Sequence, residues 1–200
     1  MFVVLEGLDG SGTSTQLQRL ASWLTTRGHS VHTTAEPSTG PVGRLIRATL
    51  QHDPEAPAPG TLPWMFAADR ADHLAREVDP ALARGEVVIS DRYLHSSLAY
   101  QSLQAPLEHV WGLNAQFRVP DLTLFVDVPA EVSMQRIEAR GERRELFEER
   151  ERLEAIRQAY HRVIARLRDR GDTIVVVDGQ GSRDHVTAVL QEHLRAHGLG

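Results

Sequence analysis

The stretch that decides the fold is "VVLEGLDGSGTSTQLQRL", residues 3–20. A short β-branched run leads into a glycine-rich loop and then into a segment with helical periodicity. This order is typical of a backbone that wraps an anion, because successive N–H groups and the positive end of the helix point inward. Gly7, Gly12 and Ser14 fit the phosphate-loop pattern G-x-x-x-x-G-K-[ST]. Thr13 stands where that pattern has lysine.

The composition predicts one globular domain, residues 1–200, in a reducing compartment. Hydrophobic residues make up 41% of the 200 residues and charged residues 24%, which is ordinary for a soluble protein with a sizeable core. Neither an apolar run of ~20 residues nor a basic leader is found, so we expect no membrane segment and no secretion signal. Cysteine is absent, which excludes disulfides and thiol catalysis and favours the cytoplasm. A net charge of −5 argues against nucleic acid as the main partner.

The missing lysine at position 13 belongs to a whole-chain pattern, because all 22 basic residues are arginine. Genome-wide base composition is the simplest reason for this bias. Arginine keeps its charge and offers a planar fork to phosphates, so it can replace lysine as a cation. Losing a fixed cation outright would cost about 10²–10³ in the rate of phosphoryl transfer. Either another cation reaches the same space, or the protein binds nucleotide without transferring phosphate.

Short apolar runs alternate with long polar-faced helical stretches along the chain. The expected strands are residues 2–6, 31–35, 87–90, 122–128 and 173–177. The expected helices lie near 13–27, 41–51, 62–83, 106–118, 130–140, 147–170 and 183–197. The alternation predicts an α/β fold of three layers, in which a five-stranded parallel sheet is flanked by helices. Ligands of such sheets bind beyond the carboxyl ends of the strands.

Four further stretches decide the class of protein: "AEPSTG" (35–40), "PWMFAADRADH" (63–73), "SDRYLHSSLAYQ" (90–101) and "RVPDLTLFVDVPAEVSMQRIEARGE" (118–142). Together with the opening loop they resemble thymidylate kinases, which are P-loop nucleoside-monophosphate kinases, from residue 2 to about 178. The pairing of "DRY…SSLAYQ" with "PDLTLFVDVP" is the specific part. The resemblance implies a P-loop NTPase fold with a mobile lid at about 139–150. It also implies transfer of the ATP γ-phosphate to dTMP, with Mg²⁺, giving dTDP.

The resemblance also implies an acceptor site. Phe66 matches the aromatic residue that stacks on thymine, Arg70 the arginine that contacts the base, and Arg92 the clamp on the monophosphate. A guanidinium fork suits phosphate oxygens. The remaining expected residues are Asp9 near the acceptor 3′-hydroxyl, Glu36 facing the same cleft, Ser97 at base and sugar, and Tyr100, whose packing would leave no room for a 2′-hydroxyl.

The donor site implied by the resemblance begins with the glycine loop and ends in the lid. Its expected loop residues are Gly7, Leu8, Asp9, Gly10, Ser11, Gly12, Thr13, Ser14 and Thr15. Ser14 and Asp91 are expected to hold Mg²⁺. In the bacterial family form whose loop lacks arginine, the lid supplies one, and here the lid stretch carries Arg136, Arg140, Arg143 and Arg144.

Among the lid arginines, Arg143 and Arg144 are the candidates for the transferring phosphate, and Arg140 is the candidate for supporting the nucleotide. An arginine supplied to phosphoryl transfer can be worth 10³–10⁵ in rate, which exceeds the loss expected at Thr13. With Asp9 and Arg92 these two arginines form the expected catalytic set. The reaction depends on positioning and charge neutralisation, so we assign no general base.

Three functions remain open on the sequence. The first is an active dTMP kinase, which the acceptor residues favour. The second is a nucleotide-binding protein with lost or weak transfer, and Thr13 is its whole basis. The third is a P-loop kinase for another acceptor. Helix 106–118, which carries Trp111, contributes to a dimer interface in the family, so the resemblance favours a homodimer.

Overall fold

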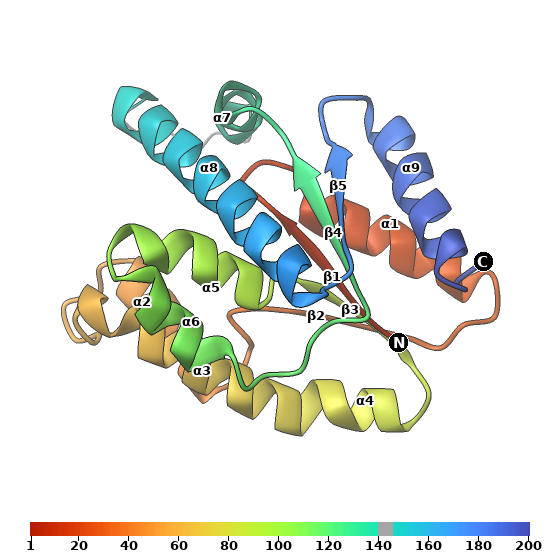
Figure 1. Ribbon diagram of the computed structural model, residues 1–200, viewed down its shortest axis with the longest axis horizontal. Helices are drawn as coiled ribbons and strands as arrows, with labels where there is room; N and C mark the ends of the chain where they lie inside the picture. The colour runs from red at the N-terminus through yellow and green to blue at the C-terminus, as the bar shows by residue number, and fades with distance from the viewer. Residues whose placement is uncertain (140–145) are drawn as a thin grey trace.

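The computed structural model describes the backbone of residues 1–139 and 146–200, and the side chains of residues 1–139 and 150–200. Five parallel strands form one sheet in the order β2-β3-β1-β4-β5, with helices on both sides (Figure 1). The strands are β1 (Phe2–Gly7), β2 (Val31–Ala35), β3 (Val87–Asp91), β4 (Leu122–Asp127) and β5 (Ile174–Asp178). The predicted three-layer α/β fold with a parallel five-stranded sheet is confirmed.

The central strand β1 lies between β3 and β4, and every one of its residues is buried. Helices cover both faces of this strand, so it must be continuously apolar rather than alternating. Glu6 is the exception, since it is a charged residue at the buried end of β1. The edge strand β2 is only partly buried and carries the polar residues His32, Thr33 and Thr34.

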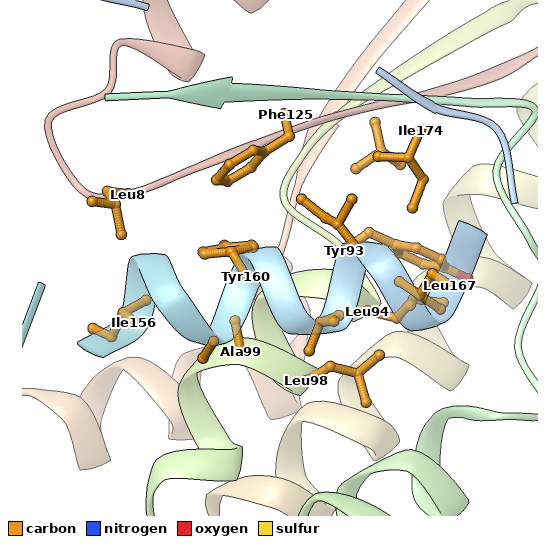
Figure 2. Packing of buried hydrophobic residues seen from close by; sticks show 14 of the residues in the cluster. Leu8, Tyr93, Leu94, Leu98, Ala99, Phe125, Ile156, Tyr160, Leu167 and Ile174 are labelled. Carbon is orange, nitrogen blue, oxygen red and sulfur yellow. The ribbon is translucent and has the colours of Figure 1, made fainter. Parts of the chain in front are cut away.

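Helices α1 (Thr13–Thr25) and α9 (Arg183–Ala196) cover one face of the sheet (Figure 1). The other face is covered by α4 (Asp79–Ala83), α5 (Leu94–Tyr100), α7 (Ala130–Glu138) and α8 (Leu146–Arg170). Figure 2 shows the ring of Tyr160, from α8, against the ring of Phe125, from β4, in this second core. The remaining helices are α2 (Pro41–Leu50), α3 (Leu62–His73) and α6 (Leu107–Asn114).

Two details of the predicted helices are wrong. The single helix expected over 62–83 is interrupted by a π-helical turn at Leu74–Val78, between α3 and α4. Pro80 lacks an N–H for the carbonyl four residues earlier, and its ring would clash with that carbonyl, which a wider turn relieves. Helix α5 was not expected as a helix at all, although its residues belong to a stretch selected for its polar motif.

The expected lid spans about residues 139–150, and nearly all of its side chains lie outside the part of the chain that the structure describes. The same is true of Arg140, Arg143 and Arg144. Among the helices that the structure describes, none is both long and apolar enough to cross a membrane.

Candidate active site

Two cavities open at the carboxyl ends of the strands, where the parallel sheet is expected to place ligands. The first has a volume of about 330 Å³ and lies over the glycine loop. The second has a volume of about 380 Å³ and lies between the residues that follow β2 and β3, helix α3 and helix α8. Asp9 and Arg92 line both cavities, so the two spaces meet at this pair.

The lining of each cavity brings together most of the residues expected from the sequence. All of the expected loop residues except Gly7 and Ser11 line the first cavity, which Asp91 also lines. The acceptor residues lining the second cavity are Asp9, Glu36, Phe66, Arg70, Arg92 and Tyr100. Ser97 is buried behind the second cavity, and its neighbour Ser96 lines it instead.

The glycine loop adopts a conformation that side chains would oppose. Gly10 and Gly12 have φ angles of +81° and +98°, in the left-handed region that glycine enters without strain. Ser11 N–H donates to Leu8 O at 3.0 Å, which closes a tight turn, and Gln16 N–H donates to Gly12 O at 3.0 Å. The amides before Gln16 therefore stand at the open end of α1, where an anion is favoured.

Helix α7 packs directly on the glycine loop. A Cβ on Gly10 would lie 2.6 Å from Ser133 O of α7. Arg136 of α7 donates through Nη1 to Ser11 O at 3.2 Å and through Nη2 to Gly179 O at 2.8 Å. Arg136, which the sequence placed in the lid stretch, thus ties the glycine loop to the segment after β5.

Ser14 and Asp91 form the best candidate metal site. Ser14 Oγ donates a 2.5 Å hydrogen bond to Asp91 Oδ2 at the edge of the first cavity. Asp91 Oδ1 is buried and has no hydrogen-bond partner among the described residues. An orphaned carboxylate oxygen beside a hydroxyl fits the oxygen ligands that Mg²⁺ prefers, and Mg²⁺ takes few protein ligands when phosphate completes its coordination. The residues present therefore fit the metal that the sequence predicts.

Arg92 stands at the boundary of the two cavities in a strained conformation. Its φ is +74°, a region that non-glycine residues enter at a cost of roughly 1–3 kcal/mol and mostly at functional sites. Its Nη2 donates to Asp9 Oδ1 at 2.7 Å, and its guanidinium lies 5.1 Å from the centre of the Tyr100 ring. The guanidinium is partly exposed and therefore available to an anion.

The second cavity combines an aromatic wall with polar atoms that lack partners. Phe66 and Tyr100 line it, and neither Tyr100 Oη nor Gln101 Oε1 has a hydrogen-bond partner in the described part of the chain. Burial raises the pKa of Tyr100, so its phenol stays neutral and can donate or accept a hydrogen bond. Such unpaired buried atoms are costly, so a polar ligand that pairs them would be favoured.

Arg70 is fully buried at the base of the second cavity and is held by three residues. Its Nη2 donates to Glu36 Oε2 at 2.6 Å and to Ser97 Oγ at 3.0 Å, while Nη1 donates to Asn114 Oδ1. Both terminal nitrogens therefore bond to the protein, whereas Nε–H has no partner in the described part of the chain.

A second buried cluster supports Glu36 from behind. His73 Nδ1 lies 3.2 Å from Glu36 Oε1, and His73 Nε2 lies 2.7 Å from Thr34 Oγ1. Burial lowers the pKa of His73, but its hydrogen bond to Glu36 and the charges of Glu36, Glu77 and Asp69 raise it more. The pKa of His73 therefore lies above its ordinary value, because these carboxylates favour its charged form.

Sequence reasoning missed Glu6, His73 and Asn114, none of which reaches the surface. Glu6 and Asn114 nevertheless left a signal. Glu6 is a charged residue inside an apolar strand, and Asn114 is the sole asparagine of the chain. A buried polar group in such a place must be paired, which marks it as part of a network.

Comparison with known proteins shows the family of this chain. A family model described as thymidylate kinase matches residues 5–188. A protein of Synechococcus sp. (strain WH7803) named thymidylate kinase is 42% identical over 180 residues, 84% of this chain and 79% of its own. Proteins named "Probable thymidylate kinase" from Thermococcus kodakarensis and Thermococcus onnurineus are 43% and 34% identical, over 70% and 97% of this chain and 72% and 98% of theirs. The chain therefore belongs to the thymidylate kinase family.

Proposed function

We propose that this protein transfers the γ-phosphate of ATP to dTMP, forming ADP and dTDP. The observation that carries the proposal is the shared boundary of the two cavities at Asp9 and Arg92. A donor phosphate over the glycine loop and an acceptor phosphate on Arg92 would meet there. Holding two reactants in this way supplies much of the rate enhancement that phosphoryl transfer needs.

The donor site follows from the first cavity. The open amides at the start of α1 and the glycine loop bind the polyphosphate, and Ser14 with Asp91 holds Mg²⁺. When bound, the metal neutralises charge that develops on the phosphate oxygens. Thr13 lines this cavity without a charge, so we assign the missing cation to Arg143 or Arg144 and nucleotide support to Arg140.

The acceptor site follows from the second cavity. Phe66 offers a flat apolar face to the thymine ring, and stacking of a base on an aromatic ring contributes about 1–3 kcal/mol in nucleic-acid complexes. Arg92 binds the monophosphate, and its partner Asp9 lies toward the sugar. Arg70 offers Nε to the base, with Ser97 and Glu36 fixing its plane. Tyr100 packs where a ribose 2′-hydroxyl would enter.

We also propose that the protein acts as a homodimer in the cytoplasm, where ATP is available. Leu45 and Leu50 of α2 and Trp64 of α3 are each about half exposed, at 49%, 49% and 52%. The Trp64 ring lies 4.8 Å from that of His109, so α6 continues this surface. Trp111 of the same helix packs under the Arg166 guanidinium, 4.0 Å from its ring centre. Sedimentation of the wild type and of Trp64→Glu tests this proposal.

ADP release from ATP and Mg²⁺, measured across a panel of nucleoside monophosphates, tests the function. Turnover confined to dTMP is the expected result. Preference for another acceptor would contradict the acceptor assignment. Thermal stabilisation by ATP without turnover on any acceptor would contradict phosphoryl transfer itself.

A further inference from the structure

The Glu6 carboxylate, buried at the end of β1, has no part in the proposed reaction, yet it is fully hydrogen-bonded. Its Oε1 accepts from Tyr93 N–H at 2.8 Å and from Ser96 N–H at 3.3 Å. Its Oε2 accepts from Ser96 Oγ at 2.6 Å and from Tyr160 Oη at 2.9 Å. A buried charge is tolerated only with such complete pairing, so the site is built around the ionised form.

The electrostatics of the cluster agree with an ionised Glu6. Burial raises the pKa of Glu6, but the nearby His95, whose Nδ1 lies 3.5 Å from Glu6 Oε1, the hydrogen bond from Ser96 and the charge of Arg92 lower it more. The pKa of Glu6 therefore lies below its ordinary value.

Three of the four groups that Glu6 accepts from belong to the segment that carries Arg92. Tyr93 N–H follows Arg92 directly, so its bond to Glu6 fixes the peptide next to the strained φ of Arg92. Ser96 Oγ also lies 3.4 Å from Arg92 Nη1. The same cluster therefore contacts the Arg92 side chain as well as the backbone beside it. Strain of this kind persists only where the surroundings over-determine it.

The fourth group comes from α8, on the far side of the cavity boundary. Tyr160 Oη lies 2.9 Å from Glu6 Oε2, 2.9 Å from Ser96 Oγ and 3.5 Å from Arg92 Nη1. Its ring packs on Phe125 (Figure 2), with the ring centres 4.9 Å apart. The Tyr100 ring lies 6.0 Å away on another side, so the core holds the hydroxyl in place. Tyr160 thus connects the helix that follows the lid stretch to the Arg92 side chain.

We propose that Glu6 and Tyr160 are positioning residues that hold the Arg92 guanidinium at the boundary of the two cavities. They act through Arg92 and Ser96 and touch neither nucleotide. The proposal rests on the proposed function, in which Arg92 binds the acceptor phosphate. It requires that loss of either group lowers kcat/KM for the acceptor nucleotide and leaves the KM for ATP unchanged.

Tyr160→Phe is the sharpest test, because it keeps the ring and removes only the hydroxyl. We expect kcat/KM for dTMP to fall about tenfold and KM for ATP to stay within twofold. The matched control is Thr187→Val, which removes a buried hydroxyl that lies 2.7 Å from both Gln16 Oε1 and Arg183 O, where α1 packs against α9. That control is expected to lower Tm without changing either KM.

Glu6→Gln provides a second variant with the same shape and no charge. Its amide oxygen can still accept from the two backbone N–H groups, so we expect a folded protein with the same selective loss on the acceptor side. If both variants lose Tm as Thr187→Val does but keep kcat/KM for dTMP within twofold, the positioning role is refuted. If Glu6→Gln does not fold, Tyr160→Phe decides alone.

A structural readout separates this inference from the proposed function. In crystals of Tyr160→Phe we expect the Arg92 guanidinium to leave its position beside Asp9 and Ser96. An unmoved Arg92 overturns the inference even if dTMP is the substrate. If the wild type does not phosphorylate dTMP, the proposed function fails, and the Arg92 position in the variant still decides whether the two residues place it.

Discussion

Ser14 Oγ donates a 2.5 Å hydrogen bond to Asp91 Oδ2, which joins the first turn of α1 to the end of β3. The contact exists because β1 and β3 are neighbours in the sheet, so the segments that follow them share one edge. It leaves Asp91 Oδ1 buried and unpaired among the described residues. The arrangement holds a carboxylate ready for a cation beside the glycine loop.

Removal of the Asp91 charge should weaken the response to metal. We expect Asp91→Asn to raise the Mg²⁺ concentration for half-maximal turnover about tenfold or more, because an amide is a poorer ligand for a hard cation. Titration of turnover with Mg²⁺ at saturating nucleotides measures this. Ser22→Ala, an exposed change on the same helix, is the control. An unchanged Mg²⁺ titration for Asp91→Asn would remove Asp91 from the metal site.

Thr13→Lys should raise turnover most in a variant that lacks the catalytic arginine of the lid. We expect Arg143→Ala or Arg144→Ala to lower turnover at least about 10²-fold. Adding Thr13→Lys to the affected variant should recover at least about tenfold, because a second cation then reaches the same phosphates. Arg162→Ala, an exposed arginine on α8, is the control. Wild-type turnover in both alanine variants would show that the lid does not compensate for Thr13.

Tyr100 should set the preference for deoxyribose. We expect Tyr100→Ala to narrow the ratio of kcat/KM for dTMP over ribothymidine 5′-monophosphate by about tenfold, because rejection of an added hydroxyl by packing is worth only about 10². Tyr100→Phe keeps the ring, so it should retain this ratio while lowering kcat/KM for both substrates. Equal ratios in the wild type and in Tyr100→Ala would place the discrimination elsewhere.

The raised pKa of His73 gives a pH dependence of stability with a definite sign. Protonated His73 stabilises the fold fully below its unfolded pKa, and this contribution is lost as pH rises through the higher folded pKa. We therefore expect His73→Gln to lower the free energy of unfolding by about 1–3 kcal/mol at acidic pH and by less at alkaline pH. Urea unfolding across this range measures the difference. A parallel loss at all pH values would refute the assignment.

Gly10 should be less replaceable than a glycine with the same backbone angle elsewhere. Gly10 and Gly28 have φ angles of +81° and +84°, but a Cβ on Gly28 would meet open space. Gly28→Ala therefore reports strain alone, about 1 kcal/mol. Gly10→Ala adds the contact with Ser133 O, so we expect a further loss of about 1–3 kcal/mol and weaker ATP binding. Equal losses in denaturant unfolding would contradict this.

The sequence predicted those parts of the site that local pattern determines. The glycine loop and the apolar strands follow from spacing alone, which is why the fold and the first cavity could be predicted. Arg70 could not be placed in this way, because its partners Glu36, Ser97 and Asn114 lie 34, 27 and 44 residues away. The resemblance assigned Arg70 to the base, but it could not show that both terminal nitrogens of Arg70 bond to other residues of the protein.

The conformation of Arg92 was also beyond local reasoning. A φ of +74° normally calls for glycine, asparagine or aspartate, and nothing in "SDRYLHSS" suggests it. Glu6, 86 residues earlier, accepts from the next N–H along the chain, and Tyr160, 68 residues later, contacts the Arg92 side chain. These residues are far apart in the sequence and contact the Arg92 segment only in the folded sheet, so a local sequence pattern cannot reveal them.

The contact between Gly10 and α7 has a consequence for protein engineering. Ser133 and Arg136 of α7 contact the glycine loop and restrict its conformation. The octapeptide "GLDGSGTS" therefore cannot be moved into another protein on its own and keep this conformation. In another scaffold, the same eight residues would lack the contacts with α7 that determine the backbone conformation of the loop. A successful graft must move the neighbouring helix with it.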